Sequence, residues 1–69
     1  MPTLVPRSDG AYVVLHSYRG QYQTWQITGE GVRFLQRYGV RDHDSFDLEL
    51  FGMLHAFGMV YTGTHPPSR

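Results

Sequence analysis

The side chains best suited to chemistry are four histidines, and their spacing argues against a metal centre. They stand at positions 16, 43, 55 and 65, and none lies four residues from another, the spacing that places two ligands on one helix face. The chain has no cysteine, so a zinc site would need ligands from distant segments. We therefore interpret His16 as a hairpin-tip residue and His55 as a partly buried helix residue, and we predict no metal site.

Three aspartates lie close together in "DHDSFD", residues 42–47. A calcium loop needs oxygen ligands at alternating positions and a glycine at the sixth. Here Phe46 occupies the fifth position and Asp47 the sixth, so the pattern fails. The segment is more typical of a polar turn followed by a helix cap.

Nucleophilic catalysis needs a serine or threonine beside a histidine and an orienting acid. Ser17 follows His16, but adjacent residues of a strand point to opposite faces. No serine lies in a nucleophile-elbow pattern, and "GEG" at 29–31 is too short for a dinucleotide fingerprint. We therefore predict that the protein is not an enzyme, with no catalytic residue and no cofactor.

Four arginines are the candidate contacts to nucleic acid. Arg33 and Arg37 lie one helical turn apart, with Arg41 just beyond them and Arg19 at a hairpin tip. A solvated face, in which Glu30 pairs with Arg33, explains the same residues. The formal net charge is zero, whereas nucleic-acid binders usually carry a basic excess. We therefore do not expect nucleic acid as a partner.

The segment "AYVVLHSYRGQYQTWQIT" predicts a β-hairpin, because β-branched and aromatic residues dominate it. A two-residue turn at Arg19 and Gly20 would pair Val14 with Trp25 and Tyr12 with Ile27. These four residues then share a core face. The other face, which we expect to be partly covered, carries Val13, Leu15, Tyr22, Thr24 and Gln26.

Two helices are predicted after the hairpin. The first runs from a Thr28 cap to Gly39. The second covers 46–57, begins at an Asp44 or Ser45 cap, and has a core stripe at helical spacing. "FDLEL" within it also alternates like a strand, but the lack of β-branched residues from 46 to 58 favours a helix. The stripe consists of Phe46, Leu50, Met53, Leu54 and Phe57.

With "MVYTG" as a return strand, the sequence predicts an α+β fold, a single small domain with a β-hairpin, two helices and a strand (ββααβ). The chain has 69 residues, enough for one domain. We expect a flexible lead-in over 1–10, the domain over 11–63 and a flexible tail over 64–69. No apolar run reaches the ~18 residues needed to cross a bilayer, so we expect no membrane partner. The absence of cysteine fits a cytoplasmic location.

A second apolar stripe on the predicted second helix has no assigned partner within the fold. Either the hairpin and the tail cover this stripe, or a second copy of the chain does. Two small residues beside it would allow another backbone to approach closely. The candidate interface is therefore Leu48, Phe51, Gly52, His55 and Ala56.

Two segments partly resemble DNA-binding families. "ITGEGVRFLQRYGVRDHDSFDLELF" resembles the half-unit of AbrB-type swapped-hairpin transcription regulators, in which a helix and a glycine-containing turn lead into an alternating strand. Gly39, Val40 and Asp44 match, whereas His43 replaces the turn glycine and no proline opens the helix. "LELFGMLHAFGMVYTG" is similar to the last helix and wing strand of a winged-helix domain.

The leading expectation is a small non-enzymatic protein-interaction module that forms a homodimer or binds another protein. The alternative, which the two resemblances imply, is a small DNA-binding transcription regulator of the winged-helix or swapped-hairpin type.

Overall fold

The computed structural model describes residues 1–65, which contain a four-stranded antiparallel sheet in the order β1-β2-β3-β4. The strands are β1 (Thr3–Pro6), β2 (Tyr12–Tyr18), β3 (Gln21–Gln26) and β4 (Val60–His65). Strands that are adjacent in the sheet are therefore also consecutive strands along the chain, with both helices between β3 and β4.

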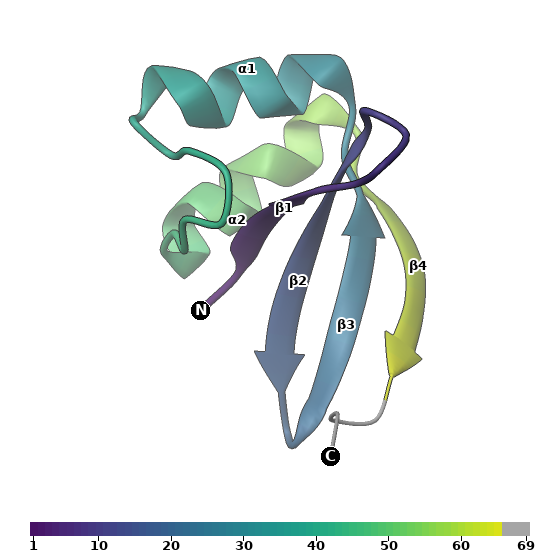
Figure 1. Ribbon diagram of the computed structural model, residues 1–69. Coiled ribbons are helices and arrows are strands. Elements are labelled where there is room, and N and C mark those ends of the chain that lie inside the picture. The colour runs from purple at the N-terminus through teal and green to yellow at the C-terminus, as the bar shows by residue number, and fades with distance from the viewer. Residues whose placement is uncertain (66–69) are drawn as a thin grey trace.

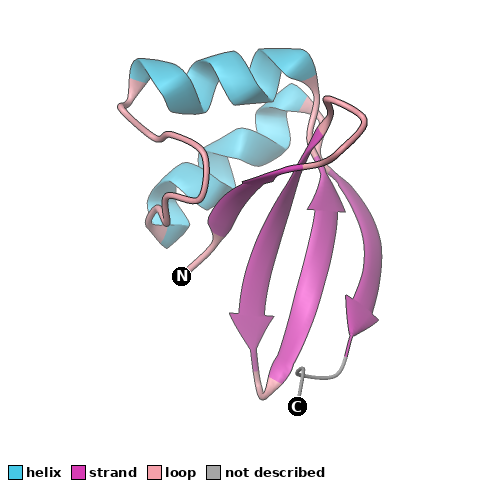
Figure 2. Cartoon of the chain, in the orientation of Figure 1, coloured by secondary structure: helices cyan, strands magenta, loops and turns pink. Residues whose placement is uncertain are grey.

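Both helices lie on one side of this sheet (Figure 1; Figure 2). They are α1 (Gly29–Arg37) and α2 (Leu48–Leu54), and α2 continues into a short 3₁₀ helix, η1 (His55–Phe57). The predicted α+β fold is confirmed, because a hairpin, two helices and a return strand follow in the predicted order. The structure adds one strand, β1, at the start.

The hairpin forms around the predicted turn. Arg19 and Gly20 have φ values of 50° and 76°, and two consecutive positive φ values are the signature of a type I′ turn, which suits the twist of a hairpin. This turn sets the register, and Val14 pairs with Trp25 as predicted. Val14 is buried, and Trp25 packs against the core.

Each helix is capped by a side chain at its start. The Gly31 amide donates a hydrogen bond of 3.2 Å to the Thr28 hydroxyl, as predicted for α1. The prediction of Asp44 or Ser45 as the second cap is wrong. The amide of Leu50 donates to the Asp47 carboxylate over 2.8 Å, so α2 begins after Asp47.

The AbrB-type resemblance implied an alternating strand through residues 46–50, but α2 already begins at Leu48. His43, where those regulators have a glycine, takes a φ of 67°, in the left-handed region that glycine favours.

The expectation of a flexible lead-in over 1–10 is wrong for β1. Leu4 pairs with Val14 and is fully buried. On its other side, the Leu4 amide donates to the Asp44 carbonyl (3.0 Å) and the Leu4 carbonyl accepts from the His43 amide (2.7 Å). A strand with prolines at 2 and 6 is possible because alternate residues of a strand direct their N–H groups to the same side. The ring nitrogens of Pro2 and Pro6 therefore lie on the side of β1 away from β2. The ladder between β1 and β2 loses no hydrogen bond to them.

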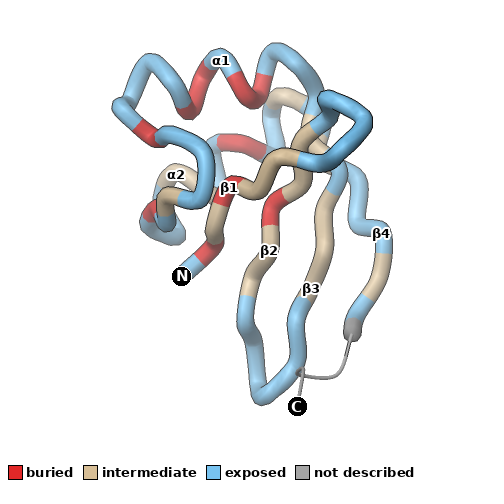
Figure 3. The backbone as a smooth tube through the Cα atoms, in the orientation of Figure 1, coloured by how far each residue is buried: buried red, intermediate tan, exposed pale blue. Residues whose placement is uncertain are grey.

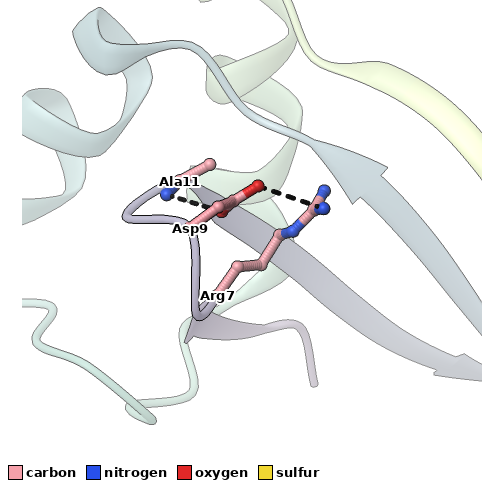
Figure 4. Close-up of polar contacts among 3 residues, drawn as sticks. All are labelled: Arg7, Asp9 and Ala11. Carbon is pink, nitrogen blue, oxygen red and sulfur yellow. Dashed lines mark hydrogen bonds and ion pairs between the residues drawn. The ribbon is translucent and has the colours of Figure 1, made fainter.

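The turn between β1 and β2 is also ordered. The Asp9 carboxylate accepts a hydrogen bond from the Ala11 amide (3.0 Å) and forms an ion pair with Arg7 at 3.2 Å (Figure 4). The Arg7 amide donates to the Ala11 carbonyl over 2.8 Å, and Gly10 adopts a φ of 86°. "RSDG" is thus a closed turn between two strands.

The core lies between the helices and the side of the sheet that they cover (Figure 3). Leu4, Val14, Leu35 and Leu54 are fully buried in it. Of the predicted stripe on the second helix, Phe46 and Leu54 are buried, and Leu50 and Phe57 pack against the core. The prediction is wrong for Met53, which is 42% exposed, because successive helical residues point about 100° apart and Leu54 takes the inward position.

β4 extends the predicted return strand to His65. The expected flexible tail over 64–69 is therefore wrong at its first two positions, and 66–69 lie outside the described residues. None of the helices in residues 1–65 is long and apolar enough to span a bilayer.

Candidate functional site

Two residues of the predicted helical interface have partners inside the fold. The rings of Phe51 and His55 lie 5.6 Å and 5.2 Å from the Trp25 ring, both nearly perpendicular to it. Phe51 also contacts His16 at 5.1 Å. The hairpin therefore contacts this part of the second stripe, the first of the two alternatives left open by the sequence. Phe51 is half-buried there, whereas His55 is exposed rather than partly buried as predicted.

The rest of the predicted interface lies on the surface of α2 and η1. Leu48 is 60% exposed, Ala56 is exposed, and no atom lies within 4 Å of a side chain added at Gly52. Glu49, also exposed, stands three residues before Gly52 and seven before Ala56, so it shares their side of the helix. This surface is small and carries a negative charge.

The four candidate arginines do not form one basic surface. Arg33 and Arg37 line a hollow of about 300 Å³ together with Glu30 and Phe57. Arg19 lies at the hairpin tip, at the opposite end of the molecule from α1 (Figure 1), with its guanidinium 5.3 Å from the centre of the Tyr18 ring.

Arg41 does not line the hollow that holds Arg33 and Arg37. Its side chain is 90% exposed and lies 4.0 Å from the Asp44 carboxylate. Each of these basic sites therefore has an acidic neighbour. Glu30 lines the hollow with Arg33 and Arg37, and Asp44 lies beside Arg41. This mixture of charges lowers the attraction that the basic residues offer to phosphate.

The aspartates of "DHDSFD" serve local structure. Asp44 accepts a hydrogen bond from the Arg41 amide at 2.8 Å, and Asp47 caps α2. The pKa of Tyr12 is raised. The largest cause is a hydrogen bond from its phenol to the Asp42 carboxylate, and desolvation and the negative charge of Asp42 add to it. Within residues 1–65, no three His, Asp or Glu side chains converge into a group that suits a metal ion.

His16 and Ser17 lie on opposite faces of β2, as predicted, since they pair with Gln23 and Tyr22 respectively. The Nδ1 atom of His16 and the Nε1 atom of Trp25 are buried without a hydrogen-bond partner. Both rings belong to the aromatic cluster around Phe51, so their apolar surroundings account for this arrangement.

The largest candidate surface is the face of the sheet turned away from the helices, which we call the outer face. None of its side chains belongs to the core cluster or packs against it. Strand pairing aligns its residues across all four strands, and, His65 at the end of β4 apart, their side chains are apolar, hydroxyl or amide groups without charge. By register and alternation, the outer face consists of Thr3, Val5, Val13, Leu15, Ser17, Tyr22, Thr24, Gln26, Val60 and Gly63, and the register ends with His65 opposite Tyr22.

The part of this face on β2 and β3 was predicted from the sequence, with the expectation that it would be partly covered. The structure extends the face with Val5 from β1 and Val60 from β4, and Val60 is 59% exposed. No helix covers it (Figure 1). The β1 part was missed because prolines at 2 and 6 conceal the alternation of Leu4 and Val5.

The two edges of the sheet differ. β1 is paired along its outer side with residues 43–46, through bonds that include Phe46 amide to Pro2 carbonyl at 2.9 Å. Among residues 1–65, no segment pairs with the outer side of β4. That strand carries an irregularity, because the register passes from Gly63 to Tyr61 and leaves Thr62 as an extra residue.

The fold and this surface define a small α+β domain with helices on one face of a four-stranded antiparallel sheet and a second face that no helix covers (Figure 1). Comparison of the chain with protein-family models, with curated proteins and with solved structures finds no match.

Proposed function

We propose that this protein is a small non-enzymatic interaction module that associates with a second copy of itself. One observation carries the proposal: an outer face that has no acid or arginine among its described residues, spans all four strands and is covered by no helix. Antiparallel sheets that face water on one side usually alternate between apolar and polar residues. The presence of Val5, Val13, Leu15 and Val60 on the solvent side departs from that pattern, which supports a role in contact with protein.

The separation of charge supports the same proposal. The charged residues of the described part of the chain lie in turns, loops and helices, such as Arg7, Arg19 and Glu49. Protein interfaces have cores depleted of charge and rims that are polar. The dispersed histidines and aspartates give no support to a catalytic role, and the cysteine-free composition is in keeping with a cytoplasmic location.

The test is the solution mass of the protein, measured by light scattering across dilutions from millimolar to micromolar, at low and at high salt. We expect mass to rise with concentration and the association to persist at high salt, because apolar contacts are not screened. A monomeric mass at every concentration would contradict the proposal. Association that disappears at high salt would indicate charge-driven contacts instead.

A further inference from the structure

We propose that two copies pack their outer faces together around a two-fold axis, so that the dimer is a sandwich of two four-stranded sheets. This inference rests on the proposed self-association and adds to it the surface and the arrangement. The partner is a second copy of this chain, and the reasons are the charge of the surface, the state of the competing surfaces and the available area.

The absence of charge favours a second copy as the partner. In a two-fold dimer both subunits use the same surface, so any charge near the centre of that surface faces a like charge. The described residues of the outer face include no acid or arginine, and the backbone register places His65 opposite Tyr22, at the end of the face and away from its centre. Arg7 and Asp9 lie in the turn at one end of the sheet and Arg19 at the other, where they would form a polar rim.

The competing surfaces are less suited to a two-fold contact. Close approach of two α2 helices across Gly52 and Ala56 would bring the two Glu49 carboxylates together, which costs energy. Edge pairing through β4 is hindered by the extra residue, Thr62, whose hydroxyl donates to the Thr24 carbonyl at 2.9 Å. Bulges of this kind protect edge strands from pairing with other chains.

The area of the outer face determines the strength of the contact. Strands spaced about 4.8 Å apart and rising about 3.3 Å per residue give this sheet a face of about 400 Å² per copy. The total of about 800 Å² is below the ~1,200 Å² that bounds weak and transient complexes. We therefore expect a dimer that forms at high micromolar or millimolar concentration and dissociates on dilution.

The centre of the face is the cross-strand pair of Leu15 and Thr24. In a face-to-face dimer the axis lies in the plane between the two sheets, so central residues approach their own copies whichever way the axis runs in that plane. Packed sheets are about 10 Å apart. A charge placed at Thr24 on both copies therefore meets a like charge at close range.

The first experiment uses the unmodified protein. Backbone amide chemical shifts are recorded across a dilution series from millimolar to micromolar. We expect the concentration-dependent shifts to gather at Val13, Leu15, Thr24 and Gln26, with little change at Leu48 and Gly52. Shifts confined to α2 or to β4 would overturn the sandwich arrangement while leaving self-association intact. A constant monomeric mass with no shifts would overturn both proposals.

The second experiment tests the two-fold axis with charge. Thr24→Lys and Thr24→Glu should each weaken association by at least about tenfold, and an equimolar mixture of the two should restore it. Leu48→Lys is the matched control on α2 and should leave association unchanged. Equal association of wild type and both Thr24 variants would overturn the inference. Circular dichroism checks that each variant is folded, and if one is not, the dilution series on the unmodified protein decides.

Discussion

The indole of Trp25 and the imidazole of His55 meet edge to face, with ring centroids 5.2 Å apart and ring planes at 79°. Tyr61 contacts the same indole at 5.1 Å and Phe51 at 5.6 Å. Trp25 thus joins β3 to β4 and to the end of α2. The rings that sequence analysis assigned to a second copy are the ones that hold the sheet and the helix together.

Truncating this indole should destabilise the fold. We expect Trp25→Ala to lower the free energy of unfolding by about 3–5 kcal/mol, because three aromatic contacts are lost at once. Urea unfolding followed by circular dichroism measures the change. Tyr18→Ala is the control, since Tyr18 lies on the same face of the sheet but is 48% exposed. Equal stability of the two variants would show that the indole is not a core residue.

Phe51→Asp should unfold the protein rather than produce a folded monomer. Phe51 is in contact with His16, Trp25 and His55, so a carboxylate there would be placed among aromatic rings without a hydrogen-bond partner. The matched variant Leu48→Asp, at a position 60% exposed, should keep the parent melting temperature. A folded, monomeric Phe51→Asp protein would return the helical surface to consideration as the interface.

Two helical glycines should respond to alanine in opposite directions. A Cβ at Gly31 would lie 2.7 Å from Ile27 Cγ1 and 3.3 Å from Leu54 Cδ1, so Gly31→Ala should be destabilising. Gly52 is inside α2 with open space around it, and Gly52→Ala should stabilise by roughly 0.5–1 kcal/mol through helix propensity. Thermal unfolding of both variants makes the comparison. Weaker self-association of Gly52→Ala would contradict the assignment of the interface to the outer face.

The Tyr12 phenol should titrate above its ordinary pKa because of Asp42. Because this pKa is raised in the folded state, the unfolded chain releases the phenol proton at lower pH than the folded chain does. The contribution of the protonated phenol to folding stability is therefore complete below the ordinary pKa and is lost as pH rises through the pKa of the folded state. Asp42→Asn should therefore lower the Tyr12 pKa and weaken the alkaline dependence of stability. NMR titration of ¹³C-labelled tyrosine follows Tyr12 in the wild type and in Asp42→Asn. An unchanged pKa in the variant would show that Asp42 is not the cause.

Random-sequence duplex DNA should not bind at physiological salt. Arg33 and Arg37 share a hollow with Glu30, while Arg19 is at the far end of the hairpin, so no single surface aligns several arginines with a phosphate backbone. A gel-shift assay with the wild type measures this. Micromolar binding that is lost in the double variant Arg33→Ala/Arg37→Ala would support the DNA-binding alternative.

Local signals were enough to predict the hairpin and the helices. The Arg19-Gly20 turn sets the register, so Val14 opposite Trp25 followed directly from the sequence. The absence of β-branched residues indicated the helix that became α2 and η1. These predictions succeeded because each depends on residues close together in the chain.

The parts that were missed depend on residues far apart. β1 is a strand because residues 43–46 and β2 pair with its two sides, and nothing within "TLVP" indicates either partner. The same pairing keeps 43–46 out of the helix, which moved the cap from Asp44 to Asp47. The part of the outer face that β1 supplies, Thr3 and Val5, was missed with that strand.

The pairing of β1 with residues 43–46 also has a consequence for synthesis on the ribosome. Thr3 and Ser45 form a side-chain hydrogen bond across 42 positions, so β1 emerges well before the segment that fills its outer edge. During that interval an unpaired strand edge is exposed to other nascent chains. Pro2 and Pro6 lack N–H groups on that same edge, so a misplaced strand finds few donors there until the proper partner arrives.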